Sequence, residues 1–316
     1  IKRSDSCPAL VWAFHPNVYA AGRLFFPVDP QVNGRYLGAD WYAPWRAVRI
    51  NELLRRDSAV TVEAIRRYQT DNLSAAAVAF LPYLLQTPAD SASPNPDAAR
   101  ARTLLRAWDG RYDLDRQGAV LFDAVMVELR RLVWDELQRP LDRRGLRPSD
   151  AQLLGLFVDS TSVWWDVTAT PARETPASVV SSALTAGLDS VVARHGPPGP
   201  AWAWSNVHRA NIHHLLRLPA LSALDLPVPW GTNTVSPSSG SGTSGPSWRM
   251  VVELGPSLKA WATYPGGQSG NPVSRHYRDF IPKWLSGDLD SLVVPVAADS
   301  FPPARIESRL RLLGGR

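Results

Sequence analysis

Cysteine and lysine are scarce in this sequence. Cys7 is the only cysteine among 316 residues, so an internal disulfide and a thiolate metal cluster are both excluded within this chain. Lysine occurs only at Lys2, Lys259 and Lys283, and arginine therefore supplies most of the 34 basic residues that face 29 acidic ones. The arginines stand mostly among Asp and Glu, a pattern that predicts solvated, mixed-charge faces and no nucleic-acid partner.

Long hydrophobic runs are also missing. No apolar run approaches the roughly 20 residues that span a bilayer, so no membrane partner is predicted. The chain begins at Ile1 and has no charged-then-apolar leader, from which we expect a processed chain or a fragment of a longer protein. With 45% hydrophobic and 20% charged residues, the composition is that of a globular protein with a sizeable core.

The chain is organised as a single fragment in four segments. They are an aromatic and proline-rich segment at 1–58, a helical section at 59–198, a β-rich section at 199–290 and a tail at 291–316. In the first, 18–21 and 24–26 are predicted as short strands. A helix is predicted over 45–56, entered after Pro44, with Ala47, Ile50, Leu53 and Leu54 toward the core and Arg49 off that stripe.

The middle section should be mostly helical. Thr61 is placed as an N-cap with an acid in the first turn that follows. Further helices are predicted over 98–108, 119–138 and 179–194, the second of them stopped by Pro140. A polar loop is expected over 87–96.

The last third changes to strands and loops. Runs 248–254 and 258–264 are separated by three turn-forming residues, which predicts an antiparallel hairpin. A Ser/Gly/Thr-rich loop is expected over 232–245. Because helices come first and strands later, the fold class is α+β rather than alternating βαβ.

General catalytic motifs give little. There is no dinucleotide fingerprint, P-loop or zincin motif. His208, His213 and His214 lie close in sequence, but no carboxylate stands at ligand spacing, so surface or packing roles are favoured over metal binding. Ser269 lies in a string that is similar to a nucleophile elbow, yet Asn271 holds the position that needs Gly, so Ser269 is interpreted as structural.

Several spaced segments match the pattern of one family. Residues 245–254 read GPSWRMVVEL, and 265–272 read PGGQSGNP, with Ser274, His276-Tyr277, Asp279, Trp284 and Gly287 following. Upstream stand Trp204 with His208-Arg209, then Trp108-Asp109-Gly110, then Tyr36-Leu37-Gly38 before the string WRAVRI at 45–50. Together these segments resemble the carboxy-terminal part of the β-subunit of penicillin acylases (penicillin amidases).

The resemblance implies an amino-terminal nucleophile hydrolase. This chain would be an incomplete part of a four-layer αββα sandwich, with a large helical middle section. An amino-terminal Ser would attack a linear amide, with its own α-amine as base. The implied partners are the missing amino-terminal segment of the β-subunit, the α-subunit of the same precursor and a small-molecule acyl amide. The implied location is extracytoplasmic, either periplasmic or secreted.

The family pattern assigns few site residues here. Ser4 and Ser6 match nothing catalytic, so the nucleophile is expected outside this chain, which should be inactive alone. The oxyanion Asn is expected at a position that Ala21 occupies. Arg49 matches an arginine of the active-site wall and is the candidate catalytic residue.

Other features of the resemblance are less specific. No cofactor is required, and a structural calcium is implied with Asp40 as its candidate ligand and Asp29 as a weaker one. Two other readings stay open. The protein is a non-catalytic, diverged acylase-like subunit or binding module, or it is an acyl-homoserine lactone acylase.

Overall fold

A computed structural model of the chain describes residues 31–32, 35–36, 43–86, 96–138, 148–293, 301–306, 308 and 310–311. The chain divides into two compact units. Among the described residues, the smaller unit comprises 59–66 and 247 onward, and the larger comprises 31–58 and 67–246. The predicted strands at 18–21 and 24–26, and all but the last residue of the loop predicted at 87–96, lie outside the described residues.

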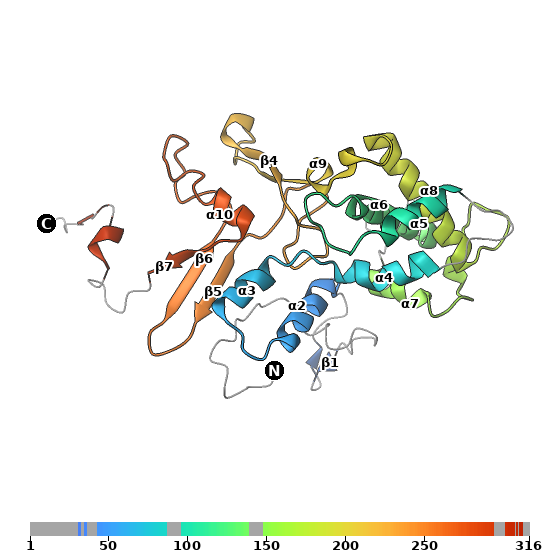
Figure 1. Ribbon diagram of the computed structural model, residues 1–316, viewed down its shortest axis with the longest axis horizontal. Coiled ribbons are helices and arrows are strands. Elements are labelled where there is room, and N and C mark those ends of the chain that lie inside the picture. The colour runs from blue at the N-terminus through green and yellow to red at the C-terminus, as the bar shows by residue number, and fades with distance from the viewer. Residues whose placement is uncertain are drawn as a thin grey trace. The chain divides into compact units, whose positions relative to one another are not determined.

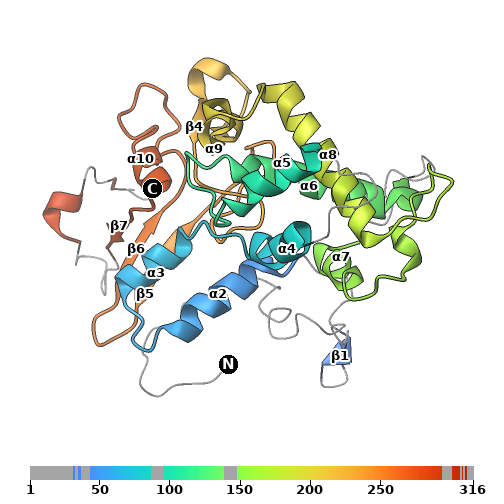
Figure 2. The same ribbon diagram turned by 45° about the vertical axis from the view of Figure 1, so that its right-hand side comes forward.

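The larger unit is built on helices. They are α2 (Trp45–Arg56), α4 (Ala75–Gln86), α5 (Pro96–Arg106), α6 (Gly118–Val133), α7 (Asp150–Leu156), α8 (Pro176–His195) and α9 (Trp204–Val207), while α3 (Val62–Gln69) spans the boundary between the units. Helices α5, α6 and α8 lie side by side (Figures 1 and 2). The α6–α8 crossing is close, because a Cβ on Gly187 would lie 2.7 Å from Cγ2 of Val125. The middle of the chain is therefore mostly helical, as predicted.

Helix α8 is the longest of the described helices. By length and composition alone it qualifies as a membrane span. That is weak evidence here, because one face of α8, including Val180, Ala183 and Leu184, is buried in the core around α6.

Two helix boundaries test the sequence predictions. Helix α2 begins after Pro44, and the Thr61 hydroxyl accepts a hydrogen bond from the Ala64 amide at 3.1 Å, so both predicted starts are confirmed. The helix predicted over 119–138 is wrong at its end. Helix α6 stops at Val133, Trp134 leaves helical geometry (φ −115°, ψ 32°) and packs edge-on against Trp164, and a 3₁₀ turn follows over Asp135–Gln138.

Two antiparallel hairpins belong to the larger unit. Strands β1 (Gln31–Val32) and β2 (Arg35–Tyr36) form the first. Strands β3 (Arg209–Ile212) and β4 (Ala223–Pro227) form the second, with a register shift between Ala210 and Ile212.

The smaller unit carries a three-stranded antiparallel sheet. Its order is β5 (Arg249–Glu253), β6 (Lys259–Thr263) and β7 (Asp290–Leu292), with helix α10 (Ile281–Ser286) between β6 and β7 in sequence. Val251 pairs with Trp261, so the predicted hairpin is confirmed. Apolar side chains at Trp248, Leu254 and Leu258 are exposed. The described residues combine helices with antiparallel strands, in agreement with the α+β class.

Candidate functional site

Helix α2 positions two arginines, Arg46 and Arg49. The helix is anchored by Trp45, which is buried and packs edge-on against Phe80 at a ring-centroid distance of 6.0 Å. Residues three apart are neighbours on a helix surface, so the two guanidinium groups leave α2 on adjacent lines. Their surroundings differ, and that difference decides what each can do.

Arg49 is held by two carboxylates. Its Nε and Nη2 donate to the two carboxylate oxygens of Asp71 at 2.8 and 2.9 Å, and its Nη1 donates to Glu52 at 3.1 Å. These hydrogen bonds, those to Asp71 above all, raise the pKa of Arg49. Three of its five N–H groups are thus committed within the described residues.

The helical stripe predicted for α2 is wrong in two positions. Arg49 is buried at 5% exposure, whereas Leu54, expected in the core, is 41% exposed. Ala47 is buried as predicted. The bidentate pair with Asp71 explains the error, because a guanidinium paired with a carboxylate can enter a core that an unpaired one cannot.

The Asp71 segment connects α2 to the Trp108-Asp109-Gly110 motif. Asn72 donates to Asp113 at 2.6 Å and accepts from Arg111 at 3.0 Å. Leu73 and Arg111 form an isolated antiparallel bridge. The Arg111 amide also donates to Asp109 at 3.0 Å, so the family-like strings at 45–50 and 108–110, which are far apart in sequence, are joined through one polar network.

Arg46 has fewer partners than Arg49. Its Nη2 lies 3.4 Å from the carbonyl oxygen of Val235, a long hydrogen bond. Its Nε is buried without a hydrogen-bond partner in the part of the chain that the structure describes. Burial lowers the pKa of Arg46, yet an arginine stays protonated at any working pH. Arg49 was predicted as a site residue and Arg46 was not, although both stand in the same string.

The loop that Arg46 touches is buried and polar. Thr234, Ser236 and Ser238 are all buried, and the Thr234 hydroxyl accepts from the Gly231 amide at 3.1 Å. A side chain at Gly231 is blocked, because its Cβ would lie 2.7 Å from the ring of Tyr112. This loop lies in the expected loop region 232–245, which has no helix or strand.

An aromatic stack continues from Tyr112 to His208. Tyr112 meets Trp204 edge-on at 4.7 Å, and Trp204 stacks on His208 at 4.7 Å. Burial lowers the pKa of His208, which favours the neutral imidazole. His208 is thus a packing histidine, as predicted, while His213 is exposed.

Asp123 on α6 is hydrogen-bonded to Tyr112 at one end of this aromatic stack. The Tyr112 hydroxyl donates to its Oδ1 at 2.6 Å. Burial raises the pKa of Asp123 to about 6 and the pKa of Tyr112 well above its usual value. This pair was not predicted, because Tyr112 lies in a loop eleven positions before Asp123 on α6, and no local pattern links the two residues.

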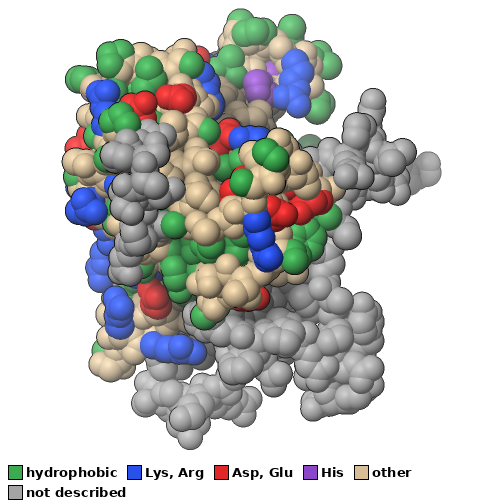
Figure 3. Space-filling view, turned by 90° about the vertical axis from the view of Figure 1, so that its right-hand side faces the viewer, with side chains coloured by type: hydrophobic (Ala, Val, Ile, Leu, Met, Phe, Trp, Pro, Cys, Tyr) green, Lys and Arg blue, Asp and Glu red, His purple; other side chains and the backbone are tan. Residues whose placement is uncertain are grey.

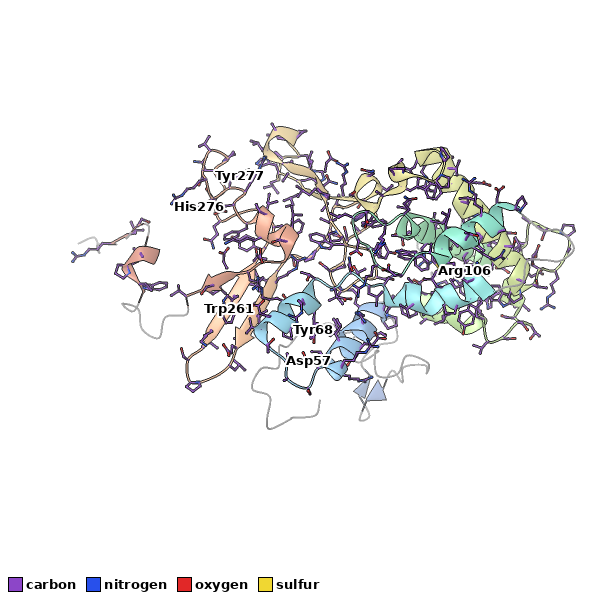
Figure 4. The ribbon with its side chains drawn as sticks, in the orientation of Figure 1. Asp57, Tyr68, Arg106, Trp261, His276 and Tyr277 are labelled. Carbon is purple, nitrogen blue, oxygen red and sulfur yellow. The ribbon has the colours of Figure 1, made fainter. Side chains whose placement is uncertain are left out.

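The loop of residues 265–280 in the smaller unit has a tight geometry. A Cβ on Gly267 would lie 2.1 Å from the carbonyl oxygen of His276. The Ser269 amide donates to that same carbonyl at 3.0 Å, and the Ser269 hydroxyl accepts from the Asn271 amide. His276 Nδ1 lies 2.7 Å from Asp279 (His276 is labelled in Figure 4). Ser269 is built into the turn, in agreement with its structural interpretation.

Tyr68 fixes the far end of α2. Its hydroxyl donates to Asp57, the residue that ends α2, at 2.6 Å (Figure 4). This hydrogen bond raises the pKa of Tyr68. Both residues belong to the larger unit, so the contact lies within it.

Several predicted site residues lie outside the described residues. They are Ser4, Ser6, Ala21, Asp29 and Asp40. Within the described residues, no group of three or more His, Cys, Asp or Glu side chains could hold a metal ion. The calcium site at Asp40 stays a prediction.

Comparison with known proteins gives the family. The penicillin amidase family model matches residues 12–298. The chain is 27% identical over 352 residues to acyl-homoserine lactone acylase QuiP of Pseudomonas putida, covering 99% of this chain and 40% of that protein. It is 30% identical over 287 residues to penicillin acylase 2 proenzyme of Pseudomonas sp. strain SE83, covering 83% of this chain and 34% of that protein.

The fold agrees with this match. Thermostable penicillin G acylase from Alcaligenes faecalis superimposes with a TM-score of 0.59 at 15% identity, over 92% of this chain and 55% of that chain. The chain belongs to the penicillin amidase family. It spans about two fifths of the length of the curated relatives it matches.

Proposed function

We propose that the chain is the carboxy-terminal part of the β-subunit of an acylase that hydrolyses linear amides. The observation that carries this proposal is the family match, which runs over residues 12–298 and so covers nearly the whole chain. The complete protein would be an amino-terminal nucleophile hydrolase with a four-layer αββα sandwich. Its other parts, a preceding β-subunit segment and an α-subunit from the same precursor, would act outside the cytoplasm.

The reaction needs one nucleophile and one base. The hydroxyl oxygen of an amino-terminal Ser bonds to the amide carbon, and the α-amine takes up the hydroxyl proton. The C–N bond then breaks, and the amine leaves with that proton. Water hydrolyses the ester that remains and releases the carboxylic acid. A free α-amine titrates near pH 8, so it can accept a proton at neutral pH.

We place that nucleophile outside this chain. Ser269, the serine in the most family-like segment, uses its hydroxyl and amide to shape its own turn. The isolated chain is then inactive. With Ala21 at the expected oxyanion position, one side-chain donor is missing, a loss that typically costs about 3 kcal/mol of barrier. Backbone amides would have to stabilise the oxyanion in its place.

Helix α2 supplies the cation of the site in this proposal. Arg49 is the predicted residue, and its pairing with Asp71 and Glu52 would fix its position. Arg46 is a second candidate on the same helix, favoured by its Nε having no partner among the described residues. Replacing each in turn separates the two assignments.

The relatives favour two different classes of amine as the leaving group of the substrate. Acyl-homoserine lactone acylases stand among the relatives at 27% and 28% identity, and a penicillin acylase at 30%. A non-catalytic, diverged subunit or binding module is the alternative outside enzymes. A structural calcium near Asp40 would belong to the same family design.

The test is product analysis on the complete protein. It is incubated with phenylacetyl and fatty-acyl amides and with acyl-homoserine lactones, and the released amines are separated by chromatography. Release of a free amine or of homoserine lactone supports an amidase and identifies its class. No release from any of them, by a protein that binds the amides, would favour the non-catalytic reading.

A further inference from the structure

The connection between β3 and β4 carries a group of exposed leucines. Leu215 is 93% exposed, Leu216 71% and Leu218 45%. Single exposed leucines are common on protein surfaces, but three within four positions form a local apolar patch. In Figure 3 a lobe at the top of the view carries green hydrophobic side chains around purple histidine and blue basic ones. We call residues 213–222 the leucine tip.

Hydrogen bonds hold the leucine tip in one conformation. The His214 amide donates to the Ser222 hydroxyl at 2.9 Å, and that hydroxyl donates to the carbonyl of Leu218 at 2.9 Å. The Leu216 amide donates to Nδ1 of His214 at 3.2 Å. Arg217 takes a left-handed backbone conformation with φ 55°, which non-glycine residues seldom adopt without support from their surroundings.

An ordered tip that displays leucines is suited to binding. Ordering a loop at the moment of association opposes binding, and here the loop is already ordered before a partner arrives. The apolar side chains therefore meet a partner with little further loss of conformational freedom.

The charged side chain within the leucine tip is basic. Arg217 is exposed, and residues 213–222 contain no Asp, Glu or Lys, while the exposed Asp225 lies beyond the tip on β4. A complementary surface would offer an apolar hollow for Leu215 and Leu216 with acidic groups at its rim.

We propose that the leucine tip docks on the preceding segment of the same acylase precursor. This inference rests on the proposed function. Its support is the length of protein outside this chain, which spans only 40% of one relative and 34% of another. Most of such a relative therefore has no counterpart here and is available to cover the patch.

The experiment measures binding of the full 316-residue chain to the preceding precursor segment, expressed separately. The tip variant is Leu215→Ser with Leu216→Ser, and the matched control is Val158→Ser, since Val158 is 85% exposed in the same unit. The tip variant should bind about tenfold more weakly or worse, and the control should bind as wild type does. Hydrogen exchange of amides 214–222 in the wild-type chain should slow when the segment is added.

The outcomes separate this inference from the proposed function. Equal binding by wild type and the tip variant, with no slowing of exchange, would overturn the docking site and leave the function standing. If the wild-type chain did not bind the segment at all, the proposed function itself would fail. Binding of the wild type to phosphatidylglycerol vesicles, or a dimer seen in sedimentation, that the tip variant loses would assign the patch to lipid or a second copy.

Discussion

The guanidinium of Arg49 and the carboxylate of Asp71 form a bidentate, buried ion pair, with N–O distances of 2.8 and 2.9 Å and side chains 6% and 10% exposed. The two residues belong to different elements, since Arg49 lies within α2 and Asp71 follows α3. The pair therefore sets how α2 meets the polar network that leads to Trp108-Asp109-Gly110.

Breaking this pair should destabilise the larger unit. Asp71→Ala leaves a buried guanidinium with Glu52 as its remaining carboxylate partner, and we expect a loss of about 3 kcal/mol in unfolding free energy. Urea unfolding followed by tryptophan fluorescence measures it. The control is Arg116→Ala, because Arg116 pairs at 3.6 Å with Asp109 and Asp113 through side chains that are all exposed, and these pairs should contribute less than about 1 kcal/mol. Equal losses in the two variants would contradict the role given to Asp71.

Asp123 should make stability depend on pH. Its pKa is raised to about 6 by burial, above the value near 3.9 of an unfolded Asp. The folded protein therefore holds a proton that the unfolded chain releases, so stability is lost as pH rises from about 4 to about 6. Asp123→Asn removes this pH dependence. Relative to wild type, the unfolding free energy of the variant should therefore be up to roughly 3 kcal/mol higher at pH 7 than at pH 4. A wild-type-to-variant difference that stays constant across this range would refute the assignment.

Gly187 should tolerate no side chain. In Gly187→Ala the new Cβ would lie 2.7 Å from Cγ2 of Val125 and 2.9 Å from its backbone, so α6 and α8 must separate. We expect a cost of about 1–3 kcal/mol, measured by thermal unfolding. Gly155→Ala in α7 is the control, since its Cβ meets nothing within 4 Å and alanine favours the helix. Two equally stable variants would show that the crossing can relax.

Replacing Arg46 and replacing Arg49 should have different effects on the activity of the complete acylase. Each is replaced by Ala in the complete acylase, and precursor cleavage, kcat and KM are measured together with stability. If Arg49 is the catalytic cation, Arg49→Ala lowers kcat or blocks cleavage beyond what its stability loss explains. Asp71→Asn, which keeps a hydrogen-bonding side chain beside Arg49, serves as the comparison. Normal turnover in Arg49→Ala, with loss confined to Arg46→Ala, would move the role to Arg46.

The sequence predicted local elements better than contacts. Helix α2 and the β5–β6 hairpin follow from a proline and a short turn, which act over a few residues. The burial of Arg49 depends on a carboxylate 22 positions away, and no local pattern carries that information. The β3–β4 hairpin was not predicted, because its strands are joined by ten residues and its register shifts at Ile212.

The most direct test of the proposed function, with its nucleophile outside this chain, compares two proteins in one amide-hydrolysis assay. The isolated 316-residue chain and the complete precursor, after processing, are given a chromogenic phenylacetyl or fatty-acyl amide. We predict no turnover by the isolated chain, and turnover by the complete protein that is lost when its amino-terminal Ser is replaced by Ala. Hydrolysis by the isolated chain that disappears in Ser4→Ala or Ser6→Ala would contradict the claim that the nucleophile comes from another segment.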